Sequence, residues 1–286
     1  MVSPYVRAHR LRAELVALRA EAGLTHAALG KLVGRDRQPI SRLENGRSLD
    51  IDLVLAILEA LKVEGERYSQ IVKAAHDAGS RGWWDSAARA MGERQALAAD
   101  LEAGAISICE YQQTIIPGLL QMPEYTRTRI EADPTPLQPG VTKEGILRGR
   151  AGRQRRLRQP DGPTYEVILN EFAVRRRSAP AAVLREQLLH IAKRADEERI
   201  TIRVLPIAAE LVDYNIPATS FTAFSYPEVG DPTVIGIETV TSYVALTDPD
   251  QVAPHLRLYD SLREAALPIE ASREFIIQVA ESICAG

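Results

Sequence analysis

The chain has few cysteines and no long apolar run, and these absences exclude several classes of protein. Its 286 residues include only two cysteines, Cys109 and Cys284, which lie far apart without a CxxC pattern or a neighbouring histidine. We expect both thiols to be reduced and partly buried, although a disulfide between them stays open. No run of about 18 apolar residues exists, so we expect no membrane-spanning helix. The first ten residues lack the apolar segment of a secretory signal, which favours a cytoplasmic location.

Motifs for catalysis and metal binding are also missing. The sequence contains no HExxH, GxSxG, GxGxxG or GxxxxGK[ST] pattern. The five histidines show no metal-ligand spacing; they are His9, His26, His76, His190 and His255. We therefore expect no catalytic residue, no metal and no cofactor, and the protein is not expected to be an enzyme. Three acids in or beside expected extended segments, Glu110, Glu171 and Glu238, leave a carboxylate pair as an alternative, but isolated acids on strands are more often structural.

Charge is unevenly distributed along the chain. The formal net charge is −3, yet residues 1–50 contain nine Lys or Arg and five Asp or Glu, a net charge of +4 that leaves −7 for the rest. A length of 286 residues favours two domains. A small basic head on a larger acidic body is typical of a module that contacts nucleic acid, attached to a domain with another task.

What is present is a pair of short helices in residues 24–46. Thr25 can cap the first helix by accepting an orphan backbone N–H. Apolar residues then recur at the spacing of one buried helix face: Ala28, Leu29, Leu32 and Val33. Gly34 stands where a helix C-terminus favours positive φ. This pattern predicts a first helix that ends in a tight turn.

The second helix follows directly. Asp36 can cap it, and Pro39 falls in its first turn, where a missing N–H removes no intrahelical bond. Ile40 and Leu43 supply its inward face, and Asn45-Gly46 ends it. Its outward face carries residue types that bond base edges: Arg37, Gln38, Ser41 and Arg42. The alternative is a helical hairpin with a solvated polar face.

These residues resemble the helix-turn-helix of Xre-type repressors, whose second helix enters the DNA major groove. The matching residues are Gly23-Leu24-Thr25, Ala28-Leu29, Gly34 and Ile40-Ser41-Arg42-Leu43-Glu44-Asn45-Gly46. The resemblance implies that Arg37, Gln38 and Arg42 read bases with help from Ser41. The residues expected to contact phosphates are Thr25, His26, Arg35, Asn45 and Arg47.

Two further expectations come from the same resemblance. Arg19 is expected to pair with Glu44 and to tie the preceding helix to the recognition helix; the alternative is a solvated Arg19. His26 stands where the family commonly has a glutamine on DNA phosphate. An imidazole N–H or the helix N-terminal amides could hold the phosphate in its place.

Three more amphipathic helices are expected at 5–22, 50–62 and 66–78, which complete an all-α, five-helix domain over residues 1–78. Residues 79–88 are the expected linker. Adjacent tryptophans cannot share one helix face, so at least one of Trp83 and Trp84 is expected to pack against the second domain or a partner subunit. A role in ligand binding is the alternative.

Residues 89–286 mix helical and strand patterns. The expected helices are 89–103, 123–132, 141–157, 181–199, 252–266 and 272–283, and the expected strands are 164–170, 200–205, 220–225 and 234–240. Residues 106–121 look like an extended stretch and a turn. This alternation predicts a larger C-terminal α+β (mixed α/β) domain, whose strand order cannot be read from the sequence.

Two basic runs lie in this domain. Residues 143–158 contain seven Lys or Arg and one acid, and Arg175-Arg176-Arg177 follows the first predicted strand. The first run could add a second phosphate-contacting surface, or be a solvated helix face or one that pairs with acids. Together the runs could build an anion-binding effector site. Candidate effector or interface residues are Trp83, Trp84, Arg153 and Arg176.

The body also resembles the C-terminal domain of actinobacterial WhiJ-like regulators, and the likeness to these proteins covers nearly the entire chain, from about Arg10 to Ile283. The residues that carry this likeness are Ile116-Pro117-Gly118-Leu119-Leu120-Gln121, Glu124-Tyr125, Arg153-Gln154, Leu157, Asn170-Glu171 and Val204-Leu205-Pro206. Proteins of that group join an Xre-type head to a domain of poorly defined function. They are often encoded beside small partner proteins and are discussed as antitoxin-like.

We therefore expect a transcription regulator that binds double-stranded DNA as a homodimer on a palindromic operator. Its body is expected to dimerise and to sense a small-molecule effector or a small partner protein. The alternative is an antitoxin-like interaction protein that binds a neighbour-encoded partner and autoregulates its operon. An enzyme with a DNA-binding head is a third class.

Overall fold

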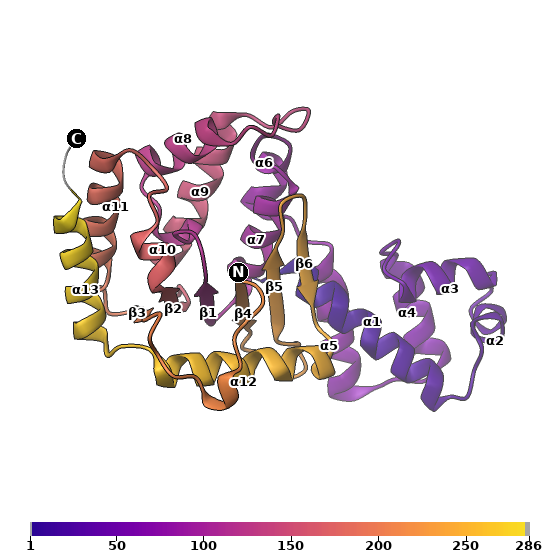
Figure 1. Ribbon diagram of the computed structural model, residues 1–286. Coiled ribbons are helices and arrows are strands. Elements are labelled where there is room, and N and C mark those ends of the chain that lie inside the picture. Colours follow the sequence, from indigo (N-terminus) through magenta and orange to yellow (C-terminus); the bar gives the residue numbers. More distant parts are fainter. Residues whose placement is uncertain (1, 284–286) are drawn as a thin grey trace. The chain divides into compact units, whose positions relative to one another are not determined.

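Residues 2–283 of the chain, except for the side chain of Asp213, are described by a computed structural model and fall into two units (Figure 1). The first unit, here called the head, contains the chain up to Gly82 together with the segment Pro227–Pro232. The second, the body, contains Trp83–Tyr226 and the chain from Thr233 onward. Cys284, expected to be a reduced thiol, lies outside the described residues. Cys109 is a free, half-buried thiol whose pKa is raised by burial.

The head is built from five helices, as its sequence predicts. They are α1 (Pro4–Glu21), α2 (His26–Leu32), α3 (Arg37–Glu44), α4 (Ile51–Ala60) and α5 (Gly65–Ala78). All five contribute to one apolar core: Leu11, Leu15, Leu18, Leu29, Ile40, Leu43, Leu53, Val54, Ile57, Leu58, Ile71, Ala74 and Ala75. Polar caps fix where helices begin, since Ser3 accepts from the N–H of Val6 and Asp50 from that of Leu53.

The body is organised around a mixed six-stranded sheet in the order β3-β2-β1-β4-β5-β6. The strands are β1 (Ser107–Gln112), β2 (Thr164–Asn170), β3 (Ile200–Leu205), β4 (Phe221–Ser225), β5 (Val234–Glu238) and β6 (Tyr243–Leu246). Strands β1, β2 and β3 pair in parallel, and β1, β4, β5 and β6 pair antiparallel. The predicted α+β class of the body is confirmed, and the order that the sequence left open is now defined.

Parallel pairing requires long crossovers, and helices supply them. Between β1 and β2 run η1 (Gly118–Leu120), α8 (Pro123–Ala132) and α9 (Lys143–Leu157); between β2 and β3 run α10 (Glu171–Arg175) and α11 (Ala181–Arg194). The short helix η2 (Val212–Tyr214) precedes β4, and α13 (Ile269–Ser282) packs beside α11 and β3.

One face of the sheet is covered by α12 (Pro249–Ala265). Tyr111 on β1 stands between Ile168 on β2 and Phe221 on β4. These three side chains share a buried cluster with Tyr259 and Leu262 of α12. Burial of such large side chains on both layers is the main source of stability in this region.

Three sequence predictions for the body need correction. The expected helix 89–103 is two helices, α6 (Trp83–Met91) and α7 (Glu93–Gly104), because Gly92 between them has φ of +87°. Helix α6 begins inside the expected linker 79–88. The helix expected at 181–199 ends at Arg194, and the sequence analysis missed α10 and β6. Both are short, so their periodicity is too brief to stand out.

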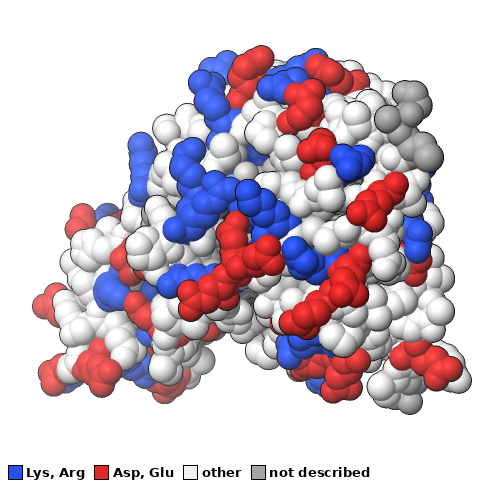
Figure 2. Space-filling view, turned by 90° about the vertical axis from the view of Figure 1, so that its left-hand side faces the viewer, with Lys and Arg blue, Asp and Glu red and all other residues white. Residues whose placement is uncertain are grey.

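The surface of the molecule carries charges of both signs. Seen from the side of α11 and α13, acidic and basic side chains lie intermixed (Figure 2). Among residues 2–283, no helix combines the length and the apolar character needed to cross a membrane.

Candidate nucleic-acid interface

Helix α2 begins and ends where local chemistry dictates. The Thr25 hydroxyl accepts a hydrogen bond from the N–H of Ala28 at 3.1 Å, which satisfies one orphan donor of the first turn. At the other end Gly34 has φ of +67°, and the N–H of Arg35 donates to the Gly30 carbonyl at 2.8 Å. This pattern closes the last turn and redirects the chain into α3.

Gly30 is a residue that the sequence analysis did not single out. It is buried, and a Cβ atom there would lie 2.8 Å from the carbonyl oxygen of Arg35 and 2.9 Å from that of Asp36. The backbone that leads into α3 therefore lies directly against α2. Only a glycine at this position allows so close an approach.

Helix α3 ends in the same way as α2. Gly46 has φ of +67°, and the N–H of Arg47 donates to the Arg42 carbonyl at 2.8 Å. The Arg12 guanidinium of α1 lies against Gly46, where a Cβ would come within 1.9 Å of its Cζ atom. A cation at this end of α3 is favourable because the C-terminal carbonyls carry partial negative charge. Arg12 was not among the functional residues predicted from the sequence.

Two local predictions were wrong. Asp36 occupies the N-cap position of α3, but its side chain makes no capping hydrogen bond. Leu32, expected on the buried face of α2, is 54% exposed. It lies about 60° around the helix axis from fully buried Leu29, which places it beyond the edge of a narrow buried face.

The outward face of α3 is polar. Arg37, Gln38 and Arg42 are exposed and Ser41 is half-buried. At about 100° per residue these four side chains span an arc of roughly 140°, and Leu43 on the other side is 2% exposed. Eight residues make a rod about 12 Å long, a size that a major groove accommodates.

This face is electropositive. Four exposed guanidiniums, those of Arg35, Arg37, Arg42 and Arg47, belong to α3 or its two flanking turns. Among the side chains that the structure describes, none of these four makes an ion pair or a hydrogen bond. Because the charges are not neutralised by the protein itself, they remain available to an anionic partner.

Glu44 joins three helices of the head. Its side chain is 4% exposed and accepts two hydrogen bonds from Arg19 of α1, both 2.8 Å long. The Nε2 atom of His26 on α2 lies 2.9 Å from Oε2 of the same carboxylate. Burial acts to raise the pKa of Glu44, but the hydrogen bonds from Arg19 and His26 outweigh burial and lower it. The expected contact between Arg19 and Glu44 is thus present.

The side chains of three expected phosphate contacts are engaged inside the head. Thr25 caps α2, and the Nε2 atom of His26 bonds Glu44, so the ring can donate to a phosphate only when both of its nitrogens carry a proton. The Asn45 amide donates to the carbonyl and the hydroxyl of Ser41 at 2.7 and 3.2 Å. Arg35 and Arg47 are the phosphate candidates whose side chains are unengaged.

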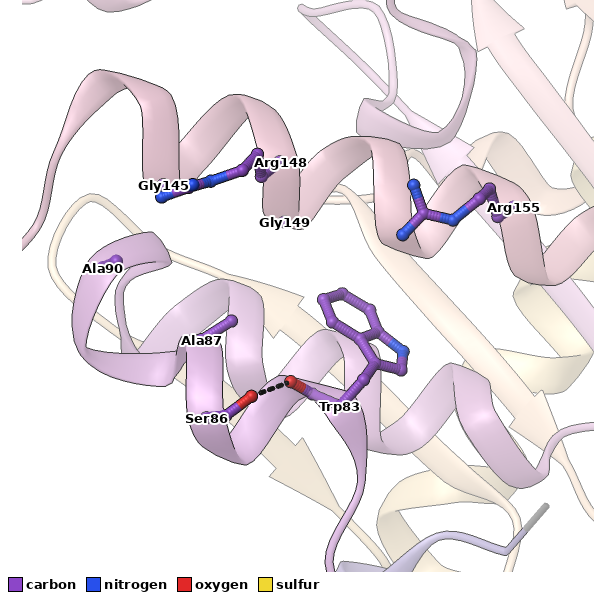
Figure 3. A pocket seen from close by; sticks show the side chains of 8 residues that line it. All are labelled: Trp83, Ser86, Ala87, Ala90, Gly145, Arg148, Gly149 and Arg155. Carbon is purple, nitrogen blue, oxygen red and sulfur yellow. Dashed lines mark hydrogen bonds between the residues drawn. The ribbon is translucent and has the colours of Figure 1, made fainter.

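The candidate effector residues lie in the body, in different surroundings. Trp84 is 3% exposed, and its ring meets that of Trp83 edge-on at a centroid distance of 6.2 Å. Trp83 is half-buried and points toward α9, where it lines a pocket (Figure 3). Arg153 donates to Glu102 at 2.6 to 3.0 Å.

Arg176 and Arg153 have different contacts within the body. Its guanidinium stacks over the Phe172 ring at 4.0 Å. Within the basic run of α9, Arg150 bonds Gln121 and Arg156 bonds Asp161. Much of the first cluster thus binds groups within the body, and an effector pocket built from both basic clusters stays a prediction.

The three acids weighed as a carboxylate pair also have separate partners. Glu110 is buried and accepts hydrogen bonds from Tyr165 at 2.6 Å and from Gln112 at 2.7 Å. Burial raises its pKa. Glu171 accepts from Arg175 and from the N–H of Ile207, and Glu238 is exposed beside Arg94.

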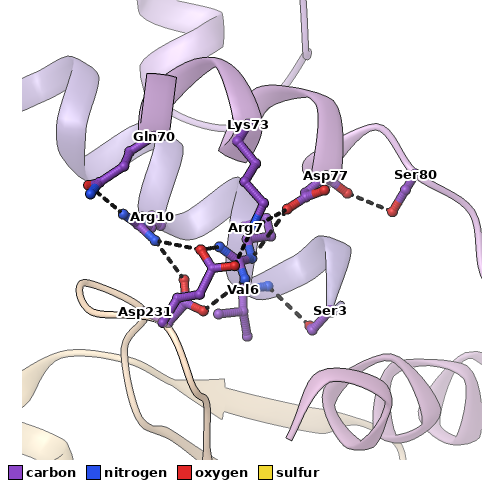
Figure 4. Close-up of polar contacts among 10 residues, drawn as sticks. Ser3, Val6, Arg7, Arg10, Gln70, Lys73, Asp77, Ser80 and Asp231 are labelled. Atoms are coloured by element: carbon purple, nitrogen blue, oxygen red, sulfur yellow. Dashed lines mark hydrogen bonds and ion pairs between the residues drawn. The ribbon is translucent and has the colours of Figure 1, made fainter. Parts of the chain in front are cut away.

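The head also contains a charge cluster that the sequence analysis missed (Figure 4). Its six members are Arg7, Arg10, Lys73, Asp77, Glu228 and Asp231. Arg7 is 3% exposed and lies 3.3 Å from Asp231, whose side chain is 1% exposed. Arg10 lies 3.3 Å from Glu228 and 3.5 Å from Asp231. The hydrogen bond from Arg7 lowers the pKa of Glu228 to about 2.

This cluster explains why Pro227–Pro232 belongs to the head. The segment follows β4 and precedes β5 in the chain, but its two acids neutralise buried arginines of α1. No periodicity links residues 220 positions apart, so the pairing could not be predicted from one sequence. A fragment that stops at Gly82 would leave Arg7 without two of its three carboxylate partners.

Two family descriptions match this chain. Residues 10–70 match a helix-turn-helix domain, a DNA-binding fold, and residues 95–278 match a domain of unknown function (DUF5753). Neither the curated proteins nor the solved structures contain a match to the chain. The helix-turn-helix match covers α2, the turn and α3, where the four unpaired guanidiniums lie.

Proposed function

Because the chain belongs to the family defined by the domain of unknown function (DUF5753) and carries a helix-turn-helix domain ahead of it, we propose that it is a sequence-specific transcription regulator of Xre type. It acts in the cytoplasm as a homodimer on a palindromic operator, and its body senses an effector or a partner. The proposal gives the body no catalytic step. The observation that carries it is the exposed polar face of α3 with its unpaired arginines.

Bases are read by three side chains of this face. Arg37 and Arg42 can each donate two hydrogen bonds to guanine, and Gln38 can donate to and accept from adenine. All three are exposed and point away from Ile40 and Leu43, which anchor α3 to the core. Ser41 assists from the centre of the arc.

Phosphate contacts fix the register of the head on DNA. Arg35 and Arg47 flank α3 and supply the unengaged charges. Thr25 and His26 act through the backbone amides at the N-terminus of α2. Asn45 acts chiefly by holding Ser41 in place.

The homodimer follows from the size of the reading surface. One eight-residue helix reaches only a few base pairs, and each correct pair is worth about 1–3 kcal/mol of discrimination. Genomic specificity needs typically 4–10 kcal/mol over non-specific binding. Two heads on half-sites about 34 Å apart, one helical turn of DNA, would supply it.

Two arginine variants test the assignment of roles. Arg37→Ala should cost about 1–3 kcal/mol on a DNA fragment selected by the wild-type protein and relax preference at one base position. Arg47→Ala should weaken binding to all sequences alike and reduce the salt dependence by about one phosphate contact. Arg158→Ala removes an exposed cation of the body and serves as the matched control. Identical sequence profiles and salt slopes for the two head variants would contradict the assignment.

A specific observation supports partner binding as the second candidate function. Between β3 and β4 the body exposes four apolar residues: Ile207 at 67%, Val212 at 59%, Tyr214 at 87% and Ile216 at 72%. Exposed apolar residues gathered in one segment mark interaction surfaces. In this second candidate function the protein is antitoxin-like. It binds a small neighbour-encoded protein through this segment and represses the operon that encodes both proteins.

Co-expression with the protein encoded beside it tests this candidate. Tyr214→Asp with Ile216→Asp should abolish co-purification, whereas Val240→Asp, at an apolar residue that is 82% exposed elsewhere in the body, should not. Unchanged co-purification of the double variant would exclude this segment as the docking surface.

A further inference from the structure

The body contains a pocket between α6 and α9 (Figure 3). Its volume is about 290 Å³, and its lining residues are Trp83, Ser86, Ala87, Ala90, Gly145, Arg148, Gly149 and Arg155. All of them belong to the body. The volume is close to the lower limit of ligand pockets, about 300 Å³, so it suits a small molecule better than a segment of a partner protein.

Close packing of the two helices shapes one wall of this pocket. A Cβ atom on Gly145 would lie 2.1 Å from the Ala90 carbonyl oxygen, and one on Gly149 would lie 2.6 Å from the sulfur of Met91. The glycines thus let α6 lie against the α9 backbone. Their role is structural, and the pocket beside them owes its chemistry to the remaining side chains.

Those side chains provide an apolar floor with a cation at each end. Arg148 and Arg155 are seven residues apart, so they lie on one face of α9 about 10 Å from each other along its axis. Trp83 projects toward α9 between them. The methyl groups of Ala87 and Ala90 complete the apolar part, and no acid lines the pocket.

The two cations are available for a ligand. Other arginines of α9 are engaged, since Arg150 bonds Gln121, Arg153 bonds Glu102 and Arg156 bonds Asp161. Arg148 and Arg155 are exposed, and neither side chain makes an ion pair or a hydrogen bond in the described part of the chain. Unpaired guanidiniums beside an indole and two methyl groups match a flat apolar molecule that carries an oxyanion.

We propose that this pocket is the effector site of the body, and that its ligand is a small molecule with a flat apolar or aromatic body and a carboxylate, sulfonate or phosphate group. Stacking on Trp83 and a charge-assisted bond from Arg148 or Arg155 hold the ligand. The site deepens the proposed sensing role and rests on it, but binding at the site does not require that the head recognise DNA.

Two matched probes test the site on the full chain without DNA. 1-Anilinonaphthalene-8-sulfonate carries the aromatic body and the anion, and N-phenyl-1-naphthylamine carries the same rings without charge. Trp83 and Trp84 are the only tryptophans of the chain, so tryptophan-sensitised probe emission reports binding near this pocket. The anionic probe should bind saturably with one site per chain and at least tenfold more tightly than the neutral probe.

Substitutions then locate the binding. Arg148→Gln with Arg155→Gln should weaken the anionic probe at least tenfold and leave the neutral probe unchanged. Arg158→Gln removes an exposed arginine just beyond the pocket and should change neither. Both substituted arginines are exposed and unpaired, so the fold should persist, which far-ultraviolet circular dichroism checks.

Three results would overturn the site: equal affinity of the wild type and the double variant for the anionic probe, equal affinity of the wild type for the two probes, or an equal loss in Arg158→Gln. A failure of the head to bind DNA would contradict the proposed function and leave these probe affinities unchanged, so the two failures are distinguishable.

Discussion

Replacement of Glu44 by glutamine should lower DNA affinity even though it removes a negative charge from a domain that binds a polyanion. The Glu44 side chain is 4% exposed and faces Arg19 and His26, so it holds α3 to α1 and α2. Glutamine keeps the shape but loses the charge and one acceptor oxygen. The recognition helix should therefore lose its rigid attachment.

The magnitude follows from three contacts. Glu44 accepts two hydrogen bonds of 2.8 Å from Arg19 and makes one contact of 2.9 Å with His26. Breaking a buried ion pair costs about 3–5 kcal/mol. Arg19 is 18% exposed at its side chain and can regain some hydration, so we expect about 2 kcal/mol. That corresponds to a roughly 30-fold larger equilibrium constant for opening of the region.

Hydrogen exchange measured by mass spectrometry on peptides that cover α1, α2 and α3 gives the direct readout. Exchange should accelerate in Glu44→Gln, and affinity for a selected DNA fragment should fall by up to about tenfold as the competent arrangement loses population. Asp36→Asn is the matched control, because Asp36 is exposed beside α3 and makes no capping bond. It should leave exchange unchanged and bind DNA equally well or more tightly. A Glu44→Gln variant that behaves like Asp36→Asn would refute the reasoning.

The contacts of Glu44 with Arg19 and His26 also predict how stability depends on pH. Because Arg19 and His26 lower the pKa of Glu44 in the folded state despite burial, its contribution to stability is fully present above about pH 4.5, the unfolded value. It is lost as the pH falls through the lower folded pKa. The stability difference between wild type and Glu44→Gln should therefore shrink below pH 4.5. Hydrogen exchange measures it, once the rates are corrected for the intrinsic exchange rate at each pH. A difference that stays constant down to pH 2 would contradict this assignment.

Three further substitutions test the packing. Asp231→Asn leaves buried Arg7 with one carboxylate fewer, but burial raises the pKa of Asp231 and offsets part of this pairing, so the head should lose only about 1–2 kcal/mol, seen as faster exchange in α1 and α5 while the body is unchanged. Gly30→Ala places a Cβ 2.8 Å from the Arg35 carbonyl and should cost about 1–3 kcal/mol, measured by thermal unfolding; an unchanged melting temperature would show that the turn can relax. Gln187→Leu removes a fully buried amide that bonds two backbone groups, and it should cost about 1–3 kcal/mol for each group left unpaired. Urea unfolding followed through tryptophan fluorescence measures this cost. A denaturation midpoint equal to that of the wild type would argue against this role of Gln187.

The parts of the head that the sequence predicted well depend on local chemistry. Thr25 as a cap, Gly34 and Gly46 at positive φ, and Ile40 and Leu43 as inward residues follow from rules that act within a few positions. Such rules also predicted the bounds of α8, β2 and β3. The error at Leu32 arose because the spacing of apolar residues indicates which side of α2 is buried but not how wide the buried surface is.

What the sequence could not supply depends on contacts between distant positions. The acids of Pro227–Pro232 serve α1, and nothing in the local pattern distinguishes them from other loop acids. Arg153 was selected as an effector residue from its charge alone, but its partner Glu102 lies 51 positions away. The sequence did not distinguish Arg148 and Arg155 from the other arginines of the same basic run. Only burial and pairing in the fold separate arginines that bind groups within the body from those that are available to a ligand.

Selection of DNA from a random pool, carried out in parallel with the wild-type protein and with a triple variant, tests the central claim most directly. The variant, Arg37→Ala with Gln38→Ala and Arg42→Ala, changes only exposed residues of α3. The wild type should enrich two inverted half-sites about 10 base pairs apart, and the triple variant should enrich none. Enrichment of the same sequence by both proteins, or of no sequence by the wild type, would contradict the claim that α3 reads DNA.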